Sequence, residues 1–201
     1  MTAPGCDLLV LDGQGVTFTD PFGAWLDDLA DATASPRPRI RSRWHDELRE
    51  RAWRGEISDD ALWAALAGAD GAAWGARLEA AYRPGPAAAH LARWAARVEI
   101  WLLSNHRTPW IEARLRRFDL RRYFARLLVS DGLGALKPSP AVFAPVLADR
   151  RHPERVLFVD DQAKNVAAAR ALGLSAVLAD PGGRWRTEVE RRLRGGKPHF
   201  T

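Results

Sequence analysis

The chain has 201 residues, 47% of them hydrophobic, and a formal net charge of +5. This length suits one domain with a modest insertion, and the composition is that of a globular protein with a buried core. No run of about 18 apolar residues is present, which argues against a membrane span. The only cysteine is Cys6, so an intrachain disulfide is excluded.

The positive charge comes almost entirely from arginine, and it is mixed with acidic residues along the chain, as in Arg49-Glu50-Arg51. Such mixing is typical of solvated helix faces and differs from the basic stripe of a nucleic-acid-binding surface. The first residues lack the basic and apolar segments of a secretory signal. We therefore expect a cytoplasmic protein, monomeric or homodimeric, with no nucleic-acid or membrane partner.

Five short apolar runs have the character of strands that are covered on both faces. They are Leu8–Leu11, Val98–Leu103, Leu127–Val129, Val156–Val159 and Ala176–Leu178. Helical patterns fill the chain after the second run, at Thr108–Phe118, Ala141–Asp149, Gln162–Leu172 and Arg184–Arg194. Alternation of strand and helix predicts a parallel sheet with right-handed crossovers.

The stretch between the first two strands is helical in character and contains no convincing strand. Its helical segments are Pro21–Ala32, Arg39–Arg54, Ser58–Ala67, Ala72–Tyr82 and Ala87–Arg97, with a loose linker at Ala34–Pro38. We predict an α/β fold, a Rossmann-like three-layer sandwich with a mostly parallel five-stranded sheet and an inserted α-helical cap. Residues 1–16 and 98–201 would form the core domain, and residues 17–97 the cap.

Tryptophan is frequent in this helical stretch, at Trp25, Trp44, Trp53, Trp63 and Trp74. Because these residues lie within amphipathic helices, we interpret them as packing residues of the cap, with room for one to line a substrate entrance.

Polar residues follow three of the predicted strands, and a lysine lies in a turn between the third and fourth strands. In an open parallel sheet, ligands bind beyond the carboxyl ends of the strands, so these side chains converge on one edge. Crowded carboxylates require a cation, and oxygen ligands suit Mg²⁺. The hydroxyl, amide and ammonium groups suit a phosphoryl group. The residues are Asp12 and Gln14 after the first strand, Ser104 and Asn105 after the second, Asp160 and Asp161 after the fourth, and Lys137 in the turn.

Four segments resemble, in order, the motifs of the haloacid dehalogenase-like (HAD) hydrolases. They are Asp12-Gly-Gln-Gly-Val16, Ser104-Asn105, Lys137-Pro-Ser-Pro140 and Val159-Asp-Asp-Gln-Ala-Lys-Asn165. The resemblance covers nearly the whole chain. The helical stretch is similar to the small helical cap of the subfamily that includes sugar phosphatases and haloacid dehalogenases (subfamily I).

The resemblance implies a role for each of these residues. Asp12 would be the nucleophile and would form an aspartyl-phosphate. Mg²⁺ would be held by Asp12, Asp161 and the backbone carbonyl of Gln14, with Asp160 close behind. Ser104 and Asn105 would position the phosphoryl oxygens, and they can also cap the helix that follows. Lys137 would neutralise developing charge, and Asn165 would buttress the acidic turn.

Gln14 departs from the family pattern, because the phosphatases of this family have an aspartate there that transfers protons. An amide cannot do so at neutral pH, and loss of such help typically costs about 10²–10⁴-fold in rate. The protein could use substrates with good leaving groups, or it could borrow an acid from elsewhere. The candidates for a borrowed acid are Asp27, Asp28, His45, Asp46 and His106, although His106 fits a polar loop residue better.

The function we expect is Mg²⁺-dependent hydrolysis of a small phosphorylated metabolite. The first alternative is a catalytically degenerate protein that binds a phosphorylated ligand or regulates a partner. The second is a 2-haloacid dehalogenase, since these enzymes also lack the aspartate that Gln14 replaces. Dehalogenases need no metal, however, and the Asp160-Asp161 pair favours one.

Overall fold

The computed structural model describes residues 5–149 and 152–194. Five strands form one sheet in the order β3-β2-β1-β4-β5, and every neighbouring pair is parallel. The predicted Rossmann-like α/β fold is confirmed, and the sheet is parallel throughout. The strands are β1 (Leu8–Leu11), β2 (Glu99–Ser104), β3 (Arg126–Val129), β4 (Val156–Asp160) and β5 (Ser175–Leu178).

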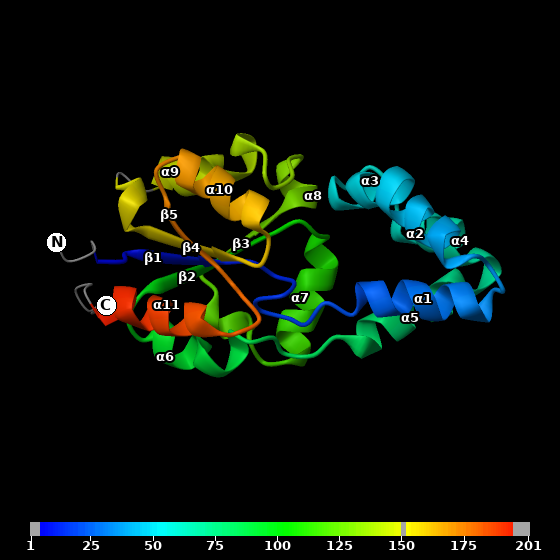
Figure 1. The fold of residues 1–201 in the computed structure, drawn as a ribbon, viewed down its shortest axis with the longest axis horizontal. Coiled ribbons are helices and arrows are strands. Elements are labelled where there is room, and N and C mark those ends of the chain that lie inside the picture. Colours follow the sequence, from blue (N-terminus) through cyan, green and yellow to red (C-terminus); the bar gives the residue numbers. More distant parts are fainter. Residues whose placement is uncertain (1–4, 150–151, 195–201) are drawn as a thin grey trace.

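Helices cover both faces of the sheet (Figure 1). Because side chains alternate along a strand, Leu8 and Val10 pack on one face, and Leu9 and Leu11 on the other. The first face is covered by α9 (Ala144–Asp149) and α10 (Ala163–Ala171), and the second by α6 (Leu91–Ala95), α7 (Thr108–Arg117) and α11 (Arg184–Arg194). A short helix, α8 (Ser130–Leu133), follows β3. The three-layer arrangement is that of the prediction.

Most of the helices between β1 and β2 lie beyond the carboxyl ends of the strands, whereas α6 covers a face of the sheet (Figure 1). We call residues 17–97 the insertion. Its longer helices are α1 (Phe22–Ala32), α2 (Arg37–Ser42), α3 (Arg49–Trp53), α4 (Asp59–Ala67) and α5 (Gly71–Ala81), with a π-helical segment, Arg43–Leu48, between α2 and α3. Short 3-10 helices occur at Gly68–Asp70, Ala88–His90, Arg121–Tyr123, Pro140–Phe143 and Pro153–Arg155.

Two local predictions need correction here. The predicted linker Ala34–Pro38 runs into α2, which begins at Arg37, because Pro38 fits the first turn of a helix. The predicted helix Arg39–Arg54 exists, but its middle turns are π-helical, and the N–H of Arg49 donates to the carbonyl of Trp44. A single π-helical turn differs from an α-helical turn by one inserted residue, which the residue pattern of a six-residue segment does not reveal.

The tryptophans of the insertion pack together and against the core domain. Trp25, Trp44, Trp53, Trp63 and Trp74 are each at most 8% exposed. The ring of Trp63 stacks on that of Trp110 in α7, with centroids 5.1 Å apart. Their interpretation as packing residues is therefore confirmed. In the described part of the chain, no helix has the length and hydrophobicity needed to cross a membrane.

Candidate active site

The turn after β1 is shaped by two glycines. A Cβ atom at Gly13 would lie 2.5 Å from the hydroxyl oxygen of Ser104, and one at Gly15 would lie 2.2 Å from Asp161 Oδ2. Gly15 also has a φ of +75°, a conformation that other residues rarely adopt. Thr17 secures the turn by donating its hydroxyl to the Asp12 carbonyl at 2.7 Å. The backbone after Asp12 can therefore lie directly against Ser104 and Asp161.

Asp12 is 4% exposed, and its two carboxylate oxygens have different surroundings. Oδ1 accepts a hydrogen bond from the backbone N–H of Gly13 at 2.6 Å and pairs with Lys137 Nζ at 2.7 Å. Oδ2 has no hydrogen-bond partner among the described residues. One oxygen thus fixes the carboxylate, and the other is available for chemistry.

Lys137 is buried, and its ammonium is fully used by the protein. It donates to the Leu103 carbonyl at 2.9 Å and to Asp160 Oδ2 at 2.6 Å, in addition to the pair with Asp12. Burial alone would lower the pKa of Lys137, but the two facing carboxylates outweigh it and raise that pKa. The lysine is therefore a fixed positive charge beside Asp12.

Asp160 is completely buried and bonded on both oxygens. Oδ1 accepts from the backbone N–H of Gln162 at 2.8 Å and from Asn165 Nδ2 at 2.9 Å. Asn165 Nδ2 also lies 3.1 Å from Oδ2. Asn165 therefore buttresses the acidic turn, as the sequence suggested.

Asp12, Asp160 and Asp161 offer oxygen atoms that lie within 4.8 Å of one another. Burial raises the pKa of Asp12 to about 8, and the neighbouring carboxylates add to the effect while Lys137 opposes it. Burial and Asp160 also raise the pKa of Asp161. Three carboxylates so close together cannot all be charged cheaply with one lysine as counter-ion, which is the situation that a bound cation relieves.

Ser104 is the last residue of β2 and Asn105 follows it, but their side chains differ in how many hydrogen bonds they make. Ser104 lines the cavity between the strand ends and the insertion, and its hydroxyl makes no hydrogen bond to the described residues. The amide of Asn105 accepts from the Lys137 N–H at 2.7 Å and donates to the Lys137 carbonyl at 2.9 Å. The expected capping of α7 by these residues is wrong, because the Thr108 N–H donates to Asp131 at 2.8 Å.

The side chain of Gln14 is oriented by two residues that the sequence analysis did not single out. Its Nε2 donates to Tyr82 Oη at 2.7 Å and to Asp20 Oδ1 at 3.3 Å. The Phe22 N–H donates to the same oxygen of Asp20 at 3.1 Å. These contacts occupy both amide hydrogens of Gln14. A carboxylate, Asp20, therefore lies next to the position where the family has its aspartate.

Of the borrowed acids suggested by the sequence, only His45 lines the main cavity. Asp27 is paired with Arg41 at 2.8 Å, and Asp46 accepts from Ser42 at 2.6 Å. Asp28 lines a separate pocket beside α1. None of these three carboxylates lines the main cavity.

His106 lies in the loop after β2, as the sequence predicted, but its side chain is part of the core. It is 0% exposed, its ring lies 4.4 Å from that of Trp53, and its Nε2 contacts Arg114 at 2.8 Å. Burial, reinforced by the charge of Arg114, lowers its pKa well below the usual value. Because its ring is neutral and buried, His106 does not serve as the acid of the cavity. The cause is the insertion, which brings Trp53 over the β2 loop.

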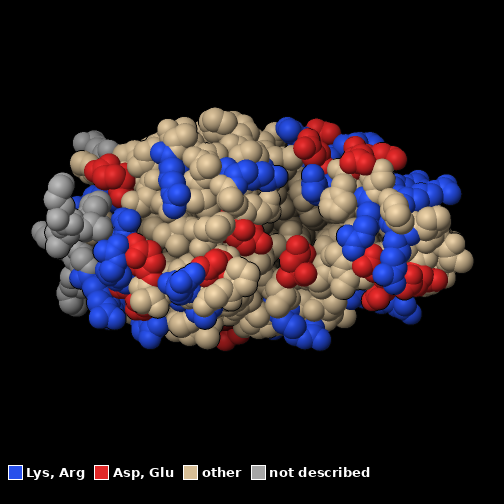
Figure 2. Space-filling view, viewed as in Figure 1, with Lys and Arg blue, Asp and Glu red and all other residues tan. Residues whose placement is uncertain are grey.

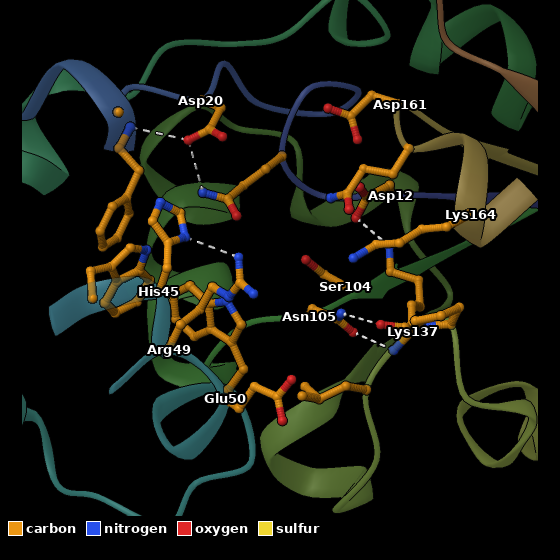
Figure 3. Close-up of a pocket in the computed structure, with 18 of the residues that line it drawn as sticks. Asp12, Asp20, His45, Arg49, Glu50, Ser104, Asn105, Lys137, Asp161 and Lys164 are labelled. Atoms are coloured by element: carbon orange, nitrogen blue, oxygen red, sulfur yellow. Dashed lines mark hydrogen bonds and ion pairs between the residues drawn. The ribbon is translucent and has the colours of Figure 1, made fainter. Parts of the chain in front are cut away.

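A cavity of about 490 Å³ lies between the strand ends and the insertion. Figure 2 shows the surface hollowed there, with acidic side chains at its rim. Figure 3 shows Asp12, Ser104 and Lys137 on the sheet side, facing His45 and Arg49 across the open space. The sequence-predicted residues Asp12, Gln14, Ser104, Asn105, Lys137 and Asp161 all line this cavity. Asp160 lies behind it, beside Lys137.

A family model described as haloacid dehalogenase-like hydrolase matches residues 24–173. The chain belongs to this family. Among curated proteins, a ribulose-1,5-bisphosphate 5-phosphatase from Halopiger xanaduensis is 37% identical over 86 residues, 42% of this chain and 36% of the relative. Drimenol cyclase drtB from Aspergillus calidoustus is 36% identical over 97 residues, 48% of this chain and 18% of the relative. The HAD chain thus spans little more than a third of these relatives at most.

A solved HAD family enzyme from Bacteroides thetaiotaomicron, in complex with magnesium and inorganic phosphate, has a similar fold. Its TM-score is 0.75 at 19% sequence identity, and the match covers 92% of this chain and 99% of that one. At this identity the likeness concerns the fold of this HAD protein, including the insertion.

Proposed function

We propose that this HAD protein is a Mg²⁺-dependent phosphatase that hydrolyses a small phosphorylated metabolite through an aspartyl-phosphate on Asp12. The observation that carries the proposal is the asymmetry of the Asp12 carboxylate, with Oδ1 held by Gly13 and Lys137 and Oδ2 free. Phosphatases among the relatives support it, including a D-ribitol-5-phosphate phosphatase and a phosphoglycolate phosphatase. We also propose that residues 17–97 act as a cap over this site.

The donor set around Asp12 fits Mg²⁺, since it consists of carboxylate oxygens within 4.8 Å of one another. Asp160 has both oxygens engaged by its neighbours, so Asp12 and Asp161 would hold the ion directly, with the carbonyl of Gln14. When bound, the ion supplies positive charge against the phosphoryl oxygens. The magnesium and phosphate in the Bacteroides thetaiotaomicron enzyme support this cofactor.

The roles of the remaining residues follow from their contacts. Asp12 Oδ2 attacks phosphorus, and the bond to the leaving oxygen breaks. Ser104 donates its unpaired hydroxyl to a phosphoryl oxygen. Lys137 favours the ionised form of Asp12 and holds its carboxylate in place, and Asn105 holds Lys137 through its backbone. Asn105 thereby acts on the phosphoryl group through Lys137.

We assign the proton transfer to Asp20, which the amide of Gln14 and the Phe22 N–H hold at the cavity. Asp20 gives a proton to the leaving alkoxide and becomes a carboxylate. It then takes a proton from the water that attacks the aspartyl-phosphate, which releases phosphate and restores Asp12. Asp20 ends the cycle in its starting state.

The experiment for this assignment compares Asp20→Asn with Asp20→Asn combined with Gln14→Asp. We expect the single variant to lose about 10²-fold in kcat/KM, which reports the departure of the leaving group, on an alkyl phosphate, and the second change to restore at least tenfold. An aryl phosphate, whose leaving group needs no proton, should lose much less. Equal losses on alkyl and aryl phosphates would remove Asp20 from the proton-transfer role.

Gln14 also favours a second candidate, a protein that binds a phosphorylated ligand and turns over little. Tight binding of a phosphate ester with Mg²⁺, but no hydrolysis of acyl, aryl or sugar phosphates, would support this candidate. Halide release from 2-haloacids that persists in a chelator would instead indicate the dehalogenase chemistry.

A further inference from the structure

The helical run from Arg41 to Arg54 contributes more cations than carboxylates to the wall of the cavity. Arg41, His45 and Arg49 follow one another at intervals of four residues, so they lie on one side of the helical run, and all line the cavity. Arg54 lines it as well, and Glu50 is the single carboxylate that this run contributes. We refer to these five residues as the insertion wall.

The arginines of the insertion wall differ in their partners. Arg41 forms a two-point ion pair with Asp27, with distances of 3.0 and 2.8 Å. Arg54 faces Glu50 at 3.9 Å. Arg49 has no carboxylate within ion-pair distance among the described residues, and its side chain contacts His45 Nδ1 at 3.1 Å. Arg49 is thus the cation of this wall that lacks a counter-ion.

The contact between Arg49 and His45 defines what the pair can bind. A guanidinium only donates hydrogen bonds, so His45 Nδ1 accepts and its proton lies on Nε2. Both side chains then present N–H donors, and neither presents an acceptor. Figure 3 shows the Arg49 guanidinium turned into the space that separates it from Ser104. An anion fits this geometry, because guanidinium groups bind carboxylates and phosphates through paired hydrogen bonds.

The phosphoryl group of the substrate does not account for this pair. In the proposed reaction it lies at Asp12 and Ser104, on the opposite wall. We propose that Arg49 and His45 form a second anion site, which binds a carboxylate or a second phosphate at the far end of the phosphorylated substrate. This inference rests on the proposed function and adds a substrate class to it: phosphate monoesters that carry another anionic group.

Lys164 strengthens the case for a strongly anionic substrate. It lies on the sheet side in the first turn of α10, lines the same cavity and has no carboxylate within ion-pair distance among the described residues. Both walls therefore hold a cation without a counter-ion. A substrate with one phosphate would pair with Lys164 and leave Arg49 without a counter-ion. A substrate with an anionic group at each end would pair with both cations.

The test uses three compounds with the same three-carbon chain: propyl phosphate, 3-(phosphonooxy)propanoate and 1,3-bis(phosphonooxy)propane. Each is titrated calorimetrically into the wild-type protein with Mg²⁺, and its hydrolysis is followed by phosphate release. We expect the wild type to bind at least one of the two doubly anionic compounds about tenfold or more tightly than propyl phosphate, as a charged hydrogen bond provides. The compound preferred identifies the second group as carboxylate or phosphate.

The decisive variant is Arg49→Gln, and Arg51→Gln is its matched control because Arg51 is an exposed arginine of the same helix outside the cavity. The preference should fall at least about fivefold in Arg49→Gln and stay unchanged in Arg51→Gln. A preference that survives Arg49→Gln, or equal or absent binding of all three compounds by the wild type, would overturn the second anion site. Binding with the expected preference but without phosphate release would reject the phosphatase and keep the site.

Discussion

The two walls of the cavity are built from different interactions. We call the side formed by Asp12, Ser104, Lys137 and Asp161 the sheet wall. Its polar side chains form one network, in which Lys137 joins Asp12 to the buried Asp160 and Asn165 donates to Asp160. On the insertion wall, the support is aromatic, since Trp44 and Trp53, which lie in the same helical segments as His45 and Arg49, pack their rings against each other.

This difference shows how one cavity can assign the reaction to one wall and the recognition of the substrate to the other. A change in the sheet network leaves a buried charge without its partner, which is costly in stability. A change at Arg49 or His45 disturbs neither the ring packing nor the ion network, because these side chains project into the cavity. The sheet wall is thus suited to fixed chemistry and the insertion wall to variable recognition.

The largest loss of activity, which would assign the reaction to the sheet wall, is expected for Asp12→Asn. Because the attacking oxygen is lost, hydrolysis of an aryl phosphate with Mg²⁺ should fall by at least about 10³-fold. Asp119→Asn is a suitable control, since that side chain is 75% exposed and remote from the cavity. Undiminished turnover by Asp12→Asn would mean that the sheet wall does not supply the nucleophile.

The aromatic support of the insertion can be weakened at Trp63, which is 8% exposed and does not line the main cavity. Trp63→Ala should lower the free energy of unfolding by about 3–5 kcal/mol, measured by urea denaturation. Turnover per folded molecule should change little. A Trp63→Ala protein that keeps its stability but loses turnover would show that this ring packing serves catalysis and not stability.

The smallest of these effects concerns pH and tests the charge balance of the sheet wall. Without metal, the pKa of Asp12 is raised to about 8, so the folded protein binds a proton there more tightly than the unfolded chain does. The free energy of unfolding that this proton contributes is therefore lost as pH rises towards 8. Mg²⁺ binds the carboxylate form, so its apparent affinity should rise with pH by up to about tenfold per unit below pH 8. The Mg²⁺-induced rise in Tm should therefore grow between about pH 6 and 8, and Asp12→Asn should flatten that dependence. A constant shift would argue against Asp12 as a ligand.

The sheet wall could be predicted from sequence because its geometry follows from topology. Asp12 and Asp161 come directly after a strand and Ser104 ends one, and parallel strands bring their carboxyl ends to one edge. The same reasoning placed Lys137 in the site, but it could not foresee that all three of its hydrogens would bond within the protein.

The surroundings of Gln14 and His106 escaped prediction because their contacts join distant parts of the chain. Gln14 meets Tyr82 across 68 positions, and His106 is buried by Trp53, so neither environment is visible in local pattern. Asp20 lies close in sequence to Gln14, yet only the fold of the turn brings the two side chains together.

The most direct test of the account is a calorimetric titration with fluoroberyllate, a mimic of the phosphoryl group on an aspartate, in the presence and absence of Mg²⁺. Binding should require Mg²⁺, vanish in Asp12→Asn and weaken by at least about tenfold in Asp161→Asn. Binding of equal strength without Mg²⁺, or in Asp12→Asn, would contradict a shared cation between Asp12 and Asp161 and with it the proposed chemistry.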